Sequence, residues 1–192
     1  MNNLKRLAVY CGSASGSSPA FAGATRATAE AMVSAGVDLV YGGGRLGLMG
    51  LVADSVLAAG GRVFGVIPEA LVELEVAHDG ITELTTVETM HERKAKMTEL
   101  ADAFLALPGG IGTLDEFFEA WSWNALGYHA KPFCLLNVDG FWDGMIEFID
   151  HATASGFLSA RRRKQLLVAT APGEALEMLD EAAAAATQGM VW

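Results

Sequence analysis

Short apolar runs alternate with amphipathic stretches along the whole chain. Seven runs of five to seven residues, rich in Val, Leu, Ile and Phe, are typical of buried strands: 7–11, 37–41, 63–67, 81–87, 103–107, 133–138 and 165–169. Stretches with helical periodicity or composition lie between and after them: 19–35, a segment through 57, 90–100, a segment through about 126, 142–154 and 173–186. Strands that are apolar throughout and separated by helices indicate a parallel sheet covered on both faces. Right-handed crossovers then predict a doubly wound, Rossmann-like α/β fold.

The chain shows no internal repeat and no linker that would divide it. Its 192 residues suit one domain of ordinary size, so we expect a single Rossmann-like domain over 1–192. The basic triplet 161–163 lies between a predicted helix and a predicted strand. A solvated loop is the expected structure there, and a patch for a partner is the alternative.

Composition narrows the possible partners. With 52% hydrophobic and 19% charged residues the chain can bury a sizeable core. A net charge of −10 argues against general nucleic-acid binding and against an anionic membrane surface, but one phosphate group needs only a few donors. No targeting segment or membrane span is visible, and Cys11 and Cys134 lie in strand-like runs. We therefore expect a cytoplasmic protein with buried free thiols.

Three glycine-containing loops, 12–16, 42–50 and 109–112, each follow a predicted strand. Loops at the carboxyl ends of strands in an open parallel sheet gather at the ligand crevice. Together they favour a ligand that carries phosphate.

The middle loop also matches the dinucleotide pattern G-x-G-x-x-G, and Glu69 follows it at a suitable distance. That pattern normally follows the first strand, whereas this one follows the second. Glycines that only permit tight turns and close packing are the alternative interpretation.

The loop over 108–116 reads Pro-Gly-Gly-Ile-Gly-Thr-Leu-Asp-Glu and opens a long helix. Glycines let backbone N–H groups face an anion, and the helix adds its positive dipole end. This segment predicts a phosphate cradle. Thr113 and Glu116 also fit a capping box, which would explain those two residues without a ligand.

The segment over 88–97 is the second candidate. Thr89 and Glu92 fit a capping box, and Met90, Arg93, Lys94 and Met97 then share one helix face. An arginine beside two methionines is expected to be partly buried and to need an anion partner; a structural ion pair is the alternative. The four histidines have no metal-like spacing, so no metal site is predicted.

Three segments, 108–116, Gly-Gly-Gly-Arg-Leu-Gly-Leu-Met-Gly at 42–50 and Met-His-Glu-Arg-Lys at 90–94, resemble the Lonely Guy family of cytokinin riboside 5′-monophosphate phosphoribohydrolases. The resemblance extends over about 7–169. It implies a Rossmann-like homodimer without a cofactor that hydrolyses nucleoside 5′-monophosphates to free base and ribose 5-phosphate.

The resemblance also implies roles for individual residues. The family's catalytic arginine and glutamate correspond to Arg93 and Glu116, and a substrate-binding lysine to Lys94. A loop glutamate corresponds by spacing to Glu75. The phosphate loop corresponds to Gly109, Gly110, Ile111, Gly112 and Thr113, with Ile111 where an aromatic residue is common.

Some members of that family were labelled lysine decarboxylases, a reaction that normally needs pyridoxal phosphate bound to a lysine. None of the five lysines follows a predicted strand in a site-like setting. Two rivals to the hydrolase stay open: a non-catalytic nucleotide sensor or carrier, and a dinucleotide-dependent oxidoreductase. The choice between adenine and an N6-prenylated adenine also stays open.

Chemistry favours Glu116 as a carboxylate that stabilises an oxocarbenium-like sugar and orients or deprotonates water. Arg93 would hold Glu116 and substrate in register. The aromatic residues Phe117, Phe118, Trp121 and Trp123 give the helix after the phosphate loop more apolar surface than one face can hide. That surface also suggests self-association.

Overall fold

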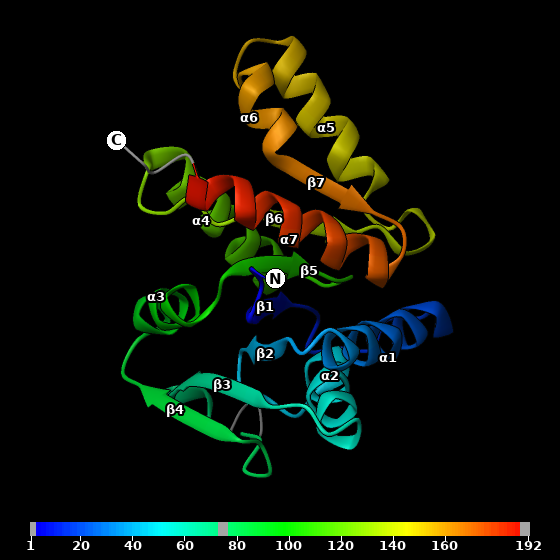
Figure 1. Cartoon of the computed structure of the whole chain (residues 1–192), viewed down its shortest axis with the longest axis vertical. Coiled ribbons are helices and arrows are strands. Elements are labelled where there is room, and N and C mark those ends of the chain that lie inside the picture. The colour runs from blue at the N-terminus through cyan, green and yellow to red at the C-terminus, as the bar shows by residue number, and fades with distance from the viewer. Residues whose placement is uncertain (1–2, 73–76, 189–192) are drawn as a thin grey trace.

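The computed structural model describes residues 3–72 and 77–188. Within them, seven parallel strands form one sheet in the order β4-β3-β2-β1-β5-β6-β7 (Figure 1). The strands are β1 (Arg6–Tyr10), β2 (Asp38–Tyr41), β3 (Val63–Pro68), β4 (Glu83–Val87), β5 (Ala103–Ala106), β6 (Phe133–Leu136) and β7 (Leu166–Ala169). The α-helices are α1 (Pro19–Ser34), α2 (Gly47–Ala58), α3 (Met90–Leu100), α4 (Ile111–Leu126), α5 (Asp143–Ala154), α6 (Ala160–Gln165) and α7 (Pro172–Gln188). Two 3-10 turns, η1 (Glu69–Leu71) and η2 (Val138–Gly140), complete them.

The strand order reverses at β1. Leu7 is paired with Leu39 of β2 on one side and with Ala103 of β5 on the other. The chain builds the sheet outward as far as β4 and then returns to place β5 beside β1. This arrangement confirms the doubly wound fold and puts the topological switch point between β1 and β5, where such sheets bind ligands.

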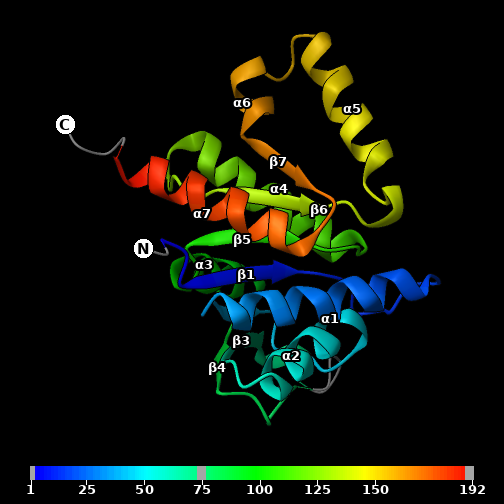
Figure 2. The same cartoon turned by 45° about the vertical axis from the view of Figure 1, so that its right-hand side comes forward.

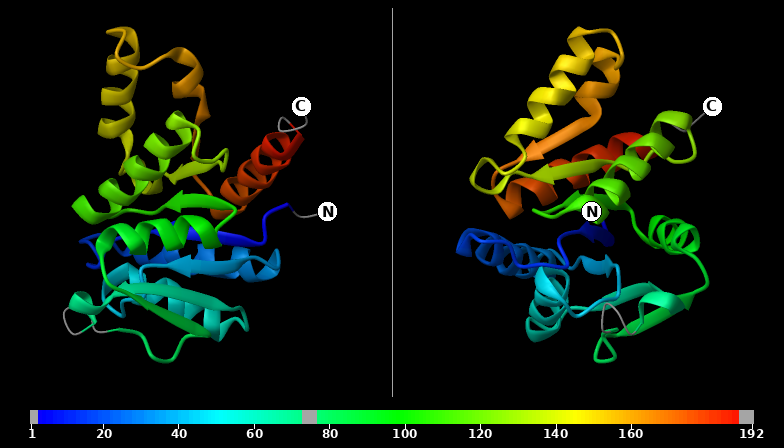
Figure 3. Two further views of the ribbon diagram at one scale, coloured as in Figure 1. Left: turned by 90° about the vertical axis from the view of Figure 1, so that its left-hand side faces the viewer. Right: turned by 180° about the vertical axis from the view of Figure 1, so that it is seen from behind.

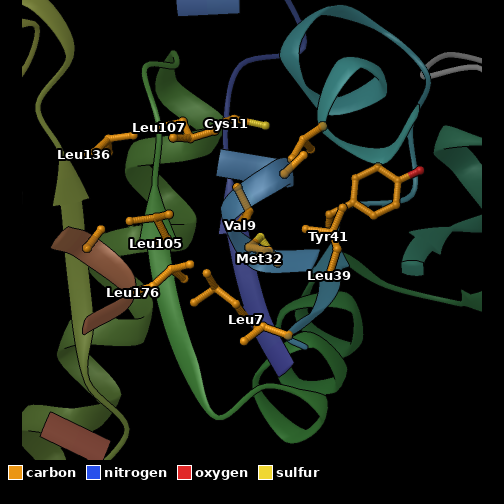
Figure 4. Packing of buried hydrophobic residues seen from close by; sticks show 14 of the residues in the cluster. Leu7, Val9, Cys11, Met32, Leu39, Tyr41, Leu105, Leu107, Leu136 and Leu176 are labelled. Atoms are coloured by element: carbon orange, nitrogen blue, oxygen red, sulfur yellow. The ribbon is translucent and has the colours of Figure 1, made fainter. Parts of the chain in front are cut away.

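Helices cover both faces of the sheet because successive strand side chains point to opposite sides. Leu7 and Val9 belong to an apolar cluster with α1, α2 and α7, whereas Ala8 and Tyr10 belong to one with α3, α4 and α5. Figures 1 and 3 show α3 and α1 on opposite sides of the sheet. Figure 4 shows Leu7, Val9 and Cys11 in a row between the side chains of β2 and β5.

The basic triplet 161–163 is not the loop that the sequence predicted. It lies in α6, which stands with α5 beyond the edge strand β7 (Figures 1 and 2). Ser159 caps this helix by accepting a hydrogen bond from the Arg162 N–H at 3.3 Å. Positive charges near a helix C-terminus are favourable, and Arg162 also donates to the Ala125 carbonyl oxygen at the end of α4 (2.6 Å).

Both cysteines are buried free thiols, as predicted. Burial raises the pKa of Cys134 to about 12, which keeps this thiol protonated at neutral pH. No helix within residues 3–72 and 77–188 combines the length and the apolar character that crossing a bilayer requires.

Candidate active site

The loops that follow β1, β2 and β5 meet at the switch point. The Gly12 N–H donates to the Pro108 carbonyl oxygen at 3.1 Å. The Gly12 carbonyl oxygen in turn accepts from the N–H groups of Leu48 (3.0 Å) and Met49 (3.2 Å) in the first turn of α2. The predicted convergence of the three glycine loops is therefore confirmed.

The helix that follows the third loop begins earlier than the sequence indicated. Its N-cap is Gly110, in extended backbone and without a side-chain cap, so Thr113 is the third residue inside α4. The capping-box interpretation of Thr113 and Glu116 is wrong for this reason. The first turn of α4 keeps N–H groups that no capping side chain occupies, which is the arrangement that binds anions at helix N-termini.

Packing requires glycine at only one of the three glycine positions in this loop. A Cβ on Gly109 would lie 2.1 Å from Thr113 Oγ1 and 2.9 Å from the Gly12 nitrogen, so packing requires glycine there. A Cβ on Gly110 or Gly112 would meet nothing within 4 Å, and neither residue has a positive φ. Packing therefore does not explain Gly110 and Gly112, and the predicted approach of a ligand to bare backbone there stays a prediction.

Arg93 is buried, with 3% of its surface exposed. It lies in the first turns of α3, which Thr89 caps by accepting from the Glu92 N–H at 3.1 Å. Its Nη2 donates to the Gly42 carbonyl oxygen (2.8 Å) and its Nε to the Val66 carbonyl oxygen (3.2 Å). The predicted burial is confirmed, and these two donors bind the carbonyl groups of Gly42, just after β2, and Val66, within β3.

Lys94 joins α3 to α4. Its Nζ lies 3.1 Å from Asp115 Oδ2 and 3.0 Å from Glu119 Oε1. Burial alone would lower its pKa, but the bonds to Glu119 and Asp115 outweigh that effect and raise the pKa. The structure thus places Lys94 in ion pairs on either side of Glu116 along α4, and its contact with substrate stays a prediction.

Glu116 is half-buried, and its charge acts on the end of β1. Burial, followed by the charges of Glu116 and Glu119, raises the pKa of Tyr10. Burial and then Glu116 likewise raise the pKa of Cys11. Both shifts indicate that the negative charge of Glu116 acts on the end of β1, beside the topological switch point.

Sequence reasoning did not assign a role to the residues that end the first two strands. Burial and then the charge of Glu116 raise the pKa of Tyr10 and of Cys11, and within the described residues the buried hydroxyl of Tyr41 has no hydrogen-bond partner. Their place at the carboxyl ends of central strands was a signal that could have found them. Glu75, the predicted loop contact, lies outside the described residues.

A doubly wound parallel sheet with a glycine loop and an open helix N-terminus at its switch point places the chain in the class of Rossmann-like α/β proteins. Solved structures support the fold assignment. The molybdenum cofactor carrier protein of Chlamydomonas reinhardtii superposes with a TM-score of 0.70 at 18% identity, covering 94% of this chain and 98% of that one. The protein TM1055 superposes with a TM-score of 0.68 at 26% identity, covering 92% and 99%.

Sequence comparison identifies the family. Residues 49–179 match the protein-family model described as "Possible lysine decarboxylase". Cytokinin riboside 5′-monophosphate phosphoribohydrolase LOG2 of Arabidopsis thaliana is 44% identical over 180 residues, which are 94% of this chain and 84% of that protein. The phosphoribohydrolase LOG of Oryza sativa subsp. japonica is 44% identical over 191 residues, 100% of this chain and 79% of that protein. The chain belongs to this family, the cytokinin riboside 5′-monophosphate phosphoribohydrolases.

Proposed function

We propose that this protein hydrolyses the N-glycosidic bond of a nucleoside 5′-monophosphate, cytokinin riboside 5′-monophosphate or AMP, to free base and ribose 5-phosphate. One observation carries the proposal: a half-buried carboxylate, Glu116, lies just over one turn into the helix whose uncapped N-terminus would hold the phosphate. From the first helical residue to Glu116 the rise is about 7.5 Å. A ribose lying between phosphate and carboxylate fits this separation.

The N–H groups of the loop, Gly109, Gly110, Ile111, Gly112 and Thr113, bind the 5′-phosphate in this proposal. The bond from the sugar C1′ to the base breaks, its electrons leave with the base, and the sugar acquires oxocarbenium character. Glu116 stabilises that cation and takes a proton from the water that adds to C1′. The departing base takes up a proton, so that water is consumed and its atoms end on the two products.

Arg93 keeps the site in register through its bonds to the carbonyl groups of Gly42, just after β2, and Val66, within β3. We assign Arg93 and Glu116 as the catalytic pair. Glu75 and Lys94 are proposed to contact substrate; Lys94 brings positive charge to the α3–α4 side of the crevice.

The five lysines have settings that do not favour decarboxylase chemistry. Lys94 and Lys96 are engaged in ion pairs, and Lys131 donates to the Thr98 carbonyl oxygen. Lys5 precedes β1 at the opposite end of that strand from the loops, and Lys164 lies in α6. We therefore propose a reaction that uses no cofactor.

Incubation with AMP and with isopentenyladenosine monophosphate tests the proposal. We expect free base and ribose 5-phosphate in equal amounts, detected by chromatography, and the ratio of the two kcat/KM values then gives the preferred base. Measured binding without release of base from either nucleotide would instead support the interpretation as a nucleotide carrier. This alternative is retained because the molybdenum cofactor carrier protein shares the fold at a TM-score of 0.70.

We further propose that residues 1–192 act as one domain, as a cytoplasmic homodimer without nucleic-acid or membrane partners. Buried free thiols and a net charge of −10 support the compartment and the absence of such partners. The dimer is supported by aromatic surface on α4 and α5: Phe118 is 39% exposed and Phe148 66% exposed, beside a groove of 290 Å³.

A further inference from the structure

The three consecutive glycines after β2 carry the carbonyl group that binds Arg93. The Gly42 oxygen accepts from Arg93 Nη2 at 2.8 Å, and a Cβ on Gly42 would lie only 2.0 Å from that nitrogen. Gly43 has a φ of +80°. Glycines are the most conformationally free residues, so the direction of this carbonyl needs support from outside the triplet.

That support comes from the segment before β4. The His78 N–H donates to the Gly43 carbonyl oxygen at 2.9 Å, and Ala77 forms an antiparallel bridge with Gly44. Arg93 and His78 therefore bind two successive carbonyl groups, and Ala77 lies opposite the third glycine. Fixing the Gly43 carbonyl limits rotation of the neighbouring peptide group, which bears the Gly42 oxygen.

The side chain of His78 is anchored in turn to α2. Its Nε2 lies 2.9 Å from Asp54 Oδ1, and its Nδ1 accepts from the Gly80 N–H at 3.3 Å. Because Nδ1 is an acceptor, we assign the proton to Nε2, which then donates to the carboxylate. His78 is 5% exposed, and both ring nitrogens have partners.

We propose that the His78–Asp54 pair is a clasp that positions Arg93 through the glycine triplet, so that His78 is a positioning residue for the reaction. This inference rests on the proposed function. It also explains the middle glycine loop without a dinucleotide, because the glycines let backbone lie against backbone and against the arginine.

A double-mutant cycle tests the clasp. We expect His78→Ala to lower kcat at least about tenfold, since small misplacement of a catalytic group has large effects. In an Arg93→Ala background the same change should cost less than about twofold, because the residue through which His78 acts is gone. Equal losses in both backgrounds would overturn the proposal and leave His78 a structural residue.

Matched variants distinguish a loss of positioning from a loss of activity caused by unfolding. His78→Gln keeps a donor near the Nε2 position and should retain kcat within about threefold. Asp54→Ala removes the acceptor from a carboxylate whose side chain is 69% exposed, so folding should survive while kcat falls. Asp79→Ala, at the exposed neighbour of His78, should change nothing. Loss of activity in Asp79→Ala, or none in Asp54→Ala, would contradict the clasp.

Hydrogen exchange separates this inference from the proposed function. The amide of residue 78, which donates to the Gly43 carbonyl oxygen, should exchange faster in His78→Ala than in wild type, with α4 unchanged. Wild type that releases no base would overturn the proposed function, whatever the exchange result. Active wild type, with unchanged kcat and unchanged exchange at the residue 78 amide in His78→Ala, would overturn the clasp alone.

Discussion

One substitution at Glu116 can distinguish a role in catalysis from a role in stability. Gly110, not Thr113, caps α4, so the Glu116 carboxylate has no capping duty in the helix. We expect Glu116→Gln to fold, to bind AMP and to lose about 10²–10³ in kcat, because it keeps the shape and loses the charge. Release of free base, nucleotide binding and thermal unfolding should be measured on the same preparation.

The neighbouring carboxylate supplies the control for this experiment. Asp115 is exposed and pairs with Lys94, so Asp115→Asn removes the same charge one position away. Its kcat should stay within about threefold of wild type, since surface ion pairs contribute little. A Glu116→Gln protein that unfolds at much lower temperature while each folded molecule stays active would make Glu116 a structural residue.

At the residue scale the sequence predicted the burial of Arg93 but not the groups that its side chain binds. Arg93 was expected to be buried because two methionines share its helix face, and it is. Two of its partners, the carbonyl oxygens of Val66 and Gly42, lie 27 and 51 residues away. No local pattern encodes a bond to backbone that only the assembled sheet brings near.

The N-terminus of α4 offers a test at the scale of one element. Gly112 lies in its first turn with open space around it, so Gly112→Ala should fold normally and gain up to about 1 kcal/mol from helix propensity. The added methyl group would stand where we place the phosphate. We therefore expect a higher KM for AMP, at least about tenfold, with thermal stability unchanged or raised.

Gly23→Ala is the matched control, because that helical glycine on α1 also has nothing within 4 Å. It should gain stability in the same way and leave KM unaltered. A Gly112→Ala protein with wild-type KM would remove the phosphate loop from the proposed site.

His129, in the connection between α4 and β6, is expected to lower the free energy of unfolding at acidic pH. Burial, followed by the charge of Lys131, lowers the pKa of His129 to about 4, while a hydrogen bond with the Ala120 backbone opposes the shift. An unfolded histidine titrates near 6.5, so between about 6.5 and 4 the unfolded chain binds a proton that the folded chain does not. The free energy of unfolding should therefore fall as the pH falls through this window.

Urea unfolding from pH 8 to pH 4 measures that dependence. His129→Gln should flatten it in this window, and His151→Gln, at an exposed histidine on α5, should not. Equal pH dependence in wild type and His129→Gln would show that other groups dominate acid unfolding.

Element boundaries show where local patterns mislead. The Thr-x-x-Glu spacing at Thr113 imitates a capping box, yet the extended backbone of Gly110 starts the helix two residues before Thr113. The triplet 161–163 was expected to be a loop because it lies between a predicted helix and a predicted strand, whereas the Ser159 cap begins a helix there. In both cases the residue just before the helix decided the outcome.

At the scale of the whole molecule, the alternation of apolar and amphipathic runs was enough to predict a doubly wound sheet. Each of the seven predicted strands is present, because runs buried on both faces have few alternatives to a central parallel strand. No single apolar run of the sequence indicates that the strand order reverses between β1 and β5. The reversal follows from which helices cover which face, and it is what brings the loops after β1, β2 and β5 to one place.

The proposed dimer is the prediction that depends on the whole molecule. Phe117 and Trp121 turn inward and belong to the core, so they do not contribute to the surplus aromatic surface that the sequence suggested. Phe118 stacks on Trp121 with ring centroids 6.1 Å apart and stays 39% exposed. With Phe148 of α5 it lines an apolar groove, the kind of surface that monomers rarely leave open to water.

Phe148→Asp should therefore convert the dimer to a monomer, because it places a charge in the centre of an apolar contact without touching the core. Phe157→Asp is the control: Phe157 is 90% exposed, more than Phe148, but does not line the groove. Sedimentation velocity at micromolar concentration should show dimers for wild type and Phe157→Asp and monomers for Phe148→Asp. A monomeric wild type would refute self-association, and a dimeric Phe148→Asp would place the interface on another face of the molecule.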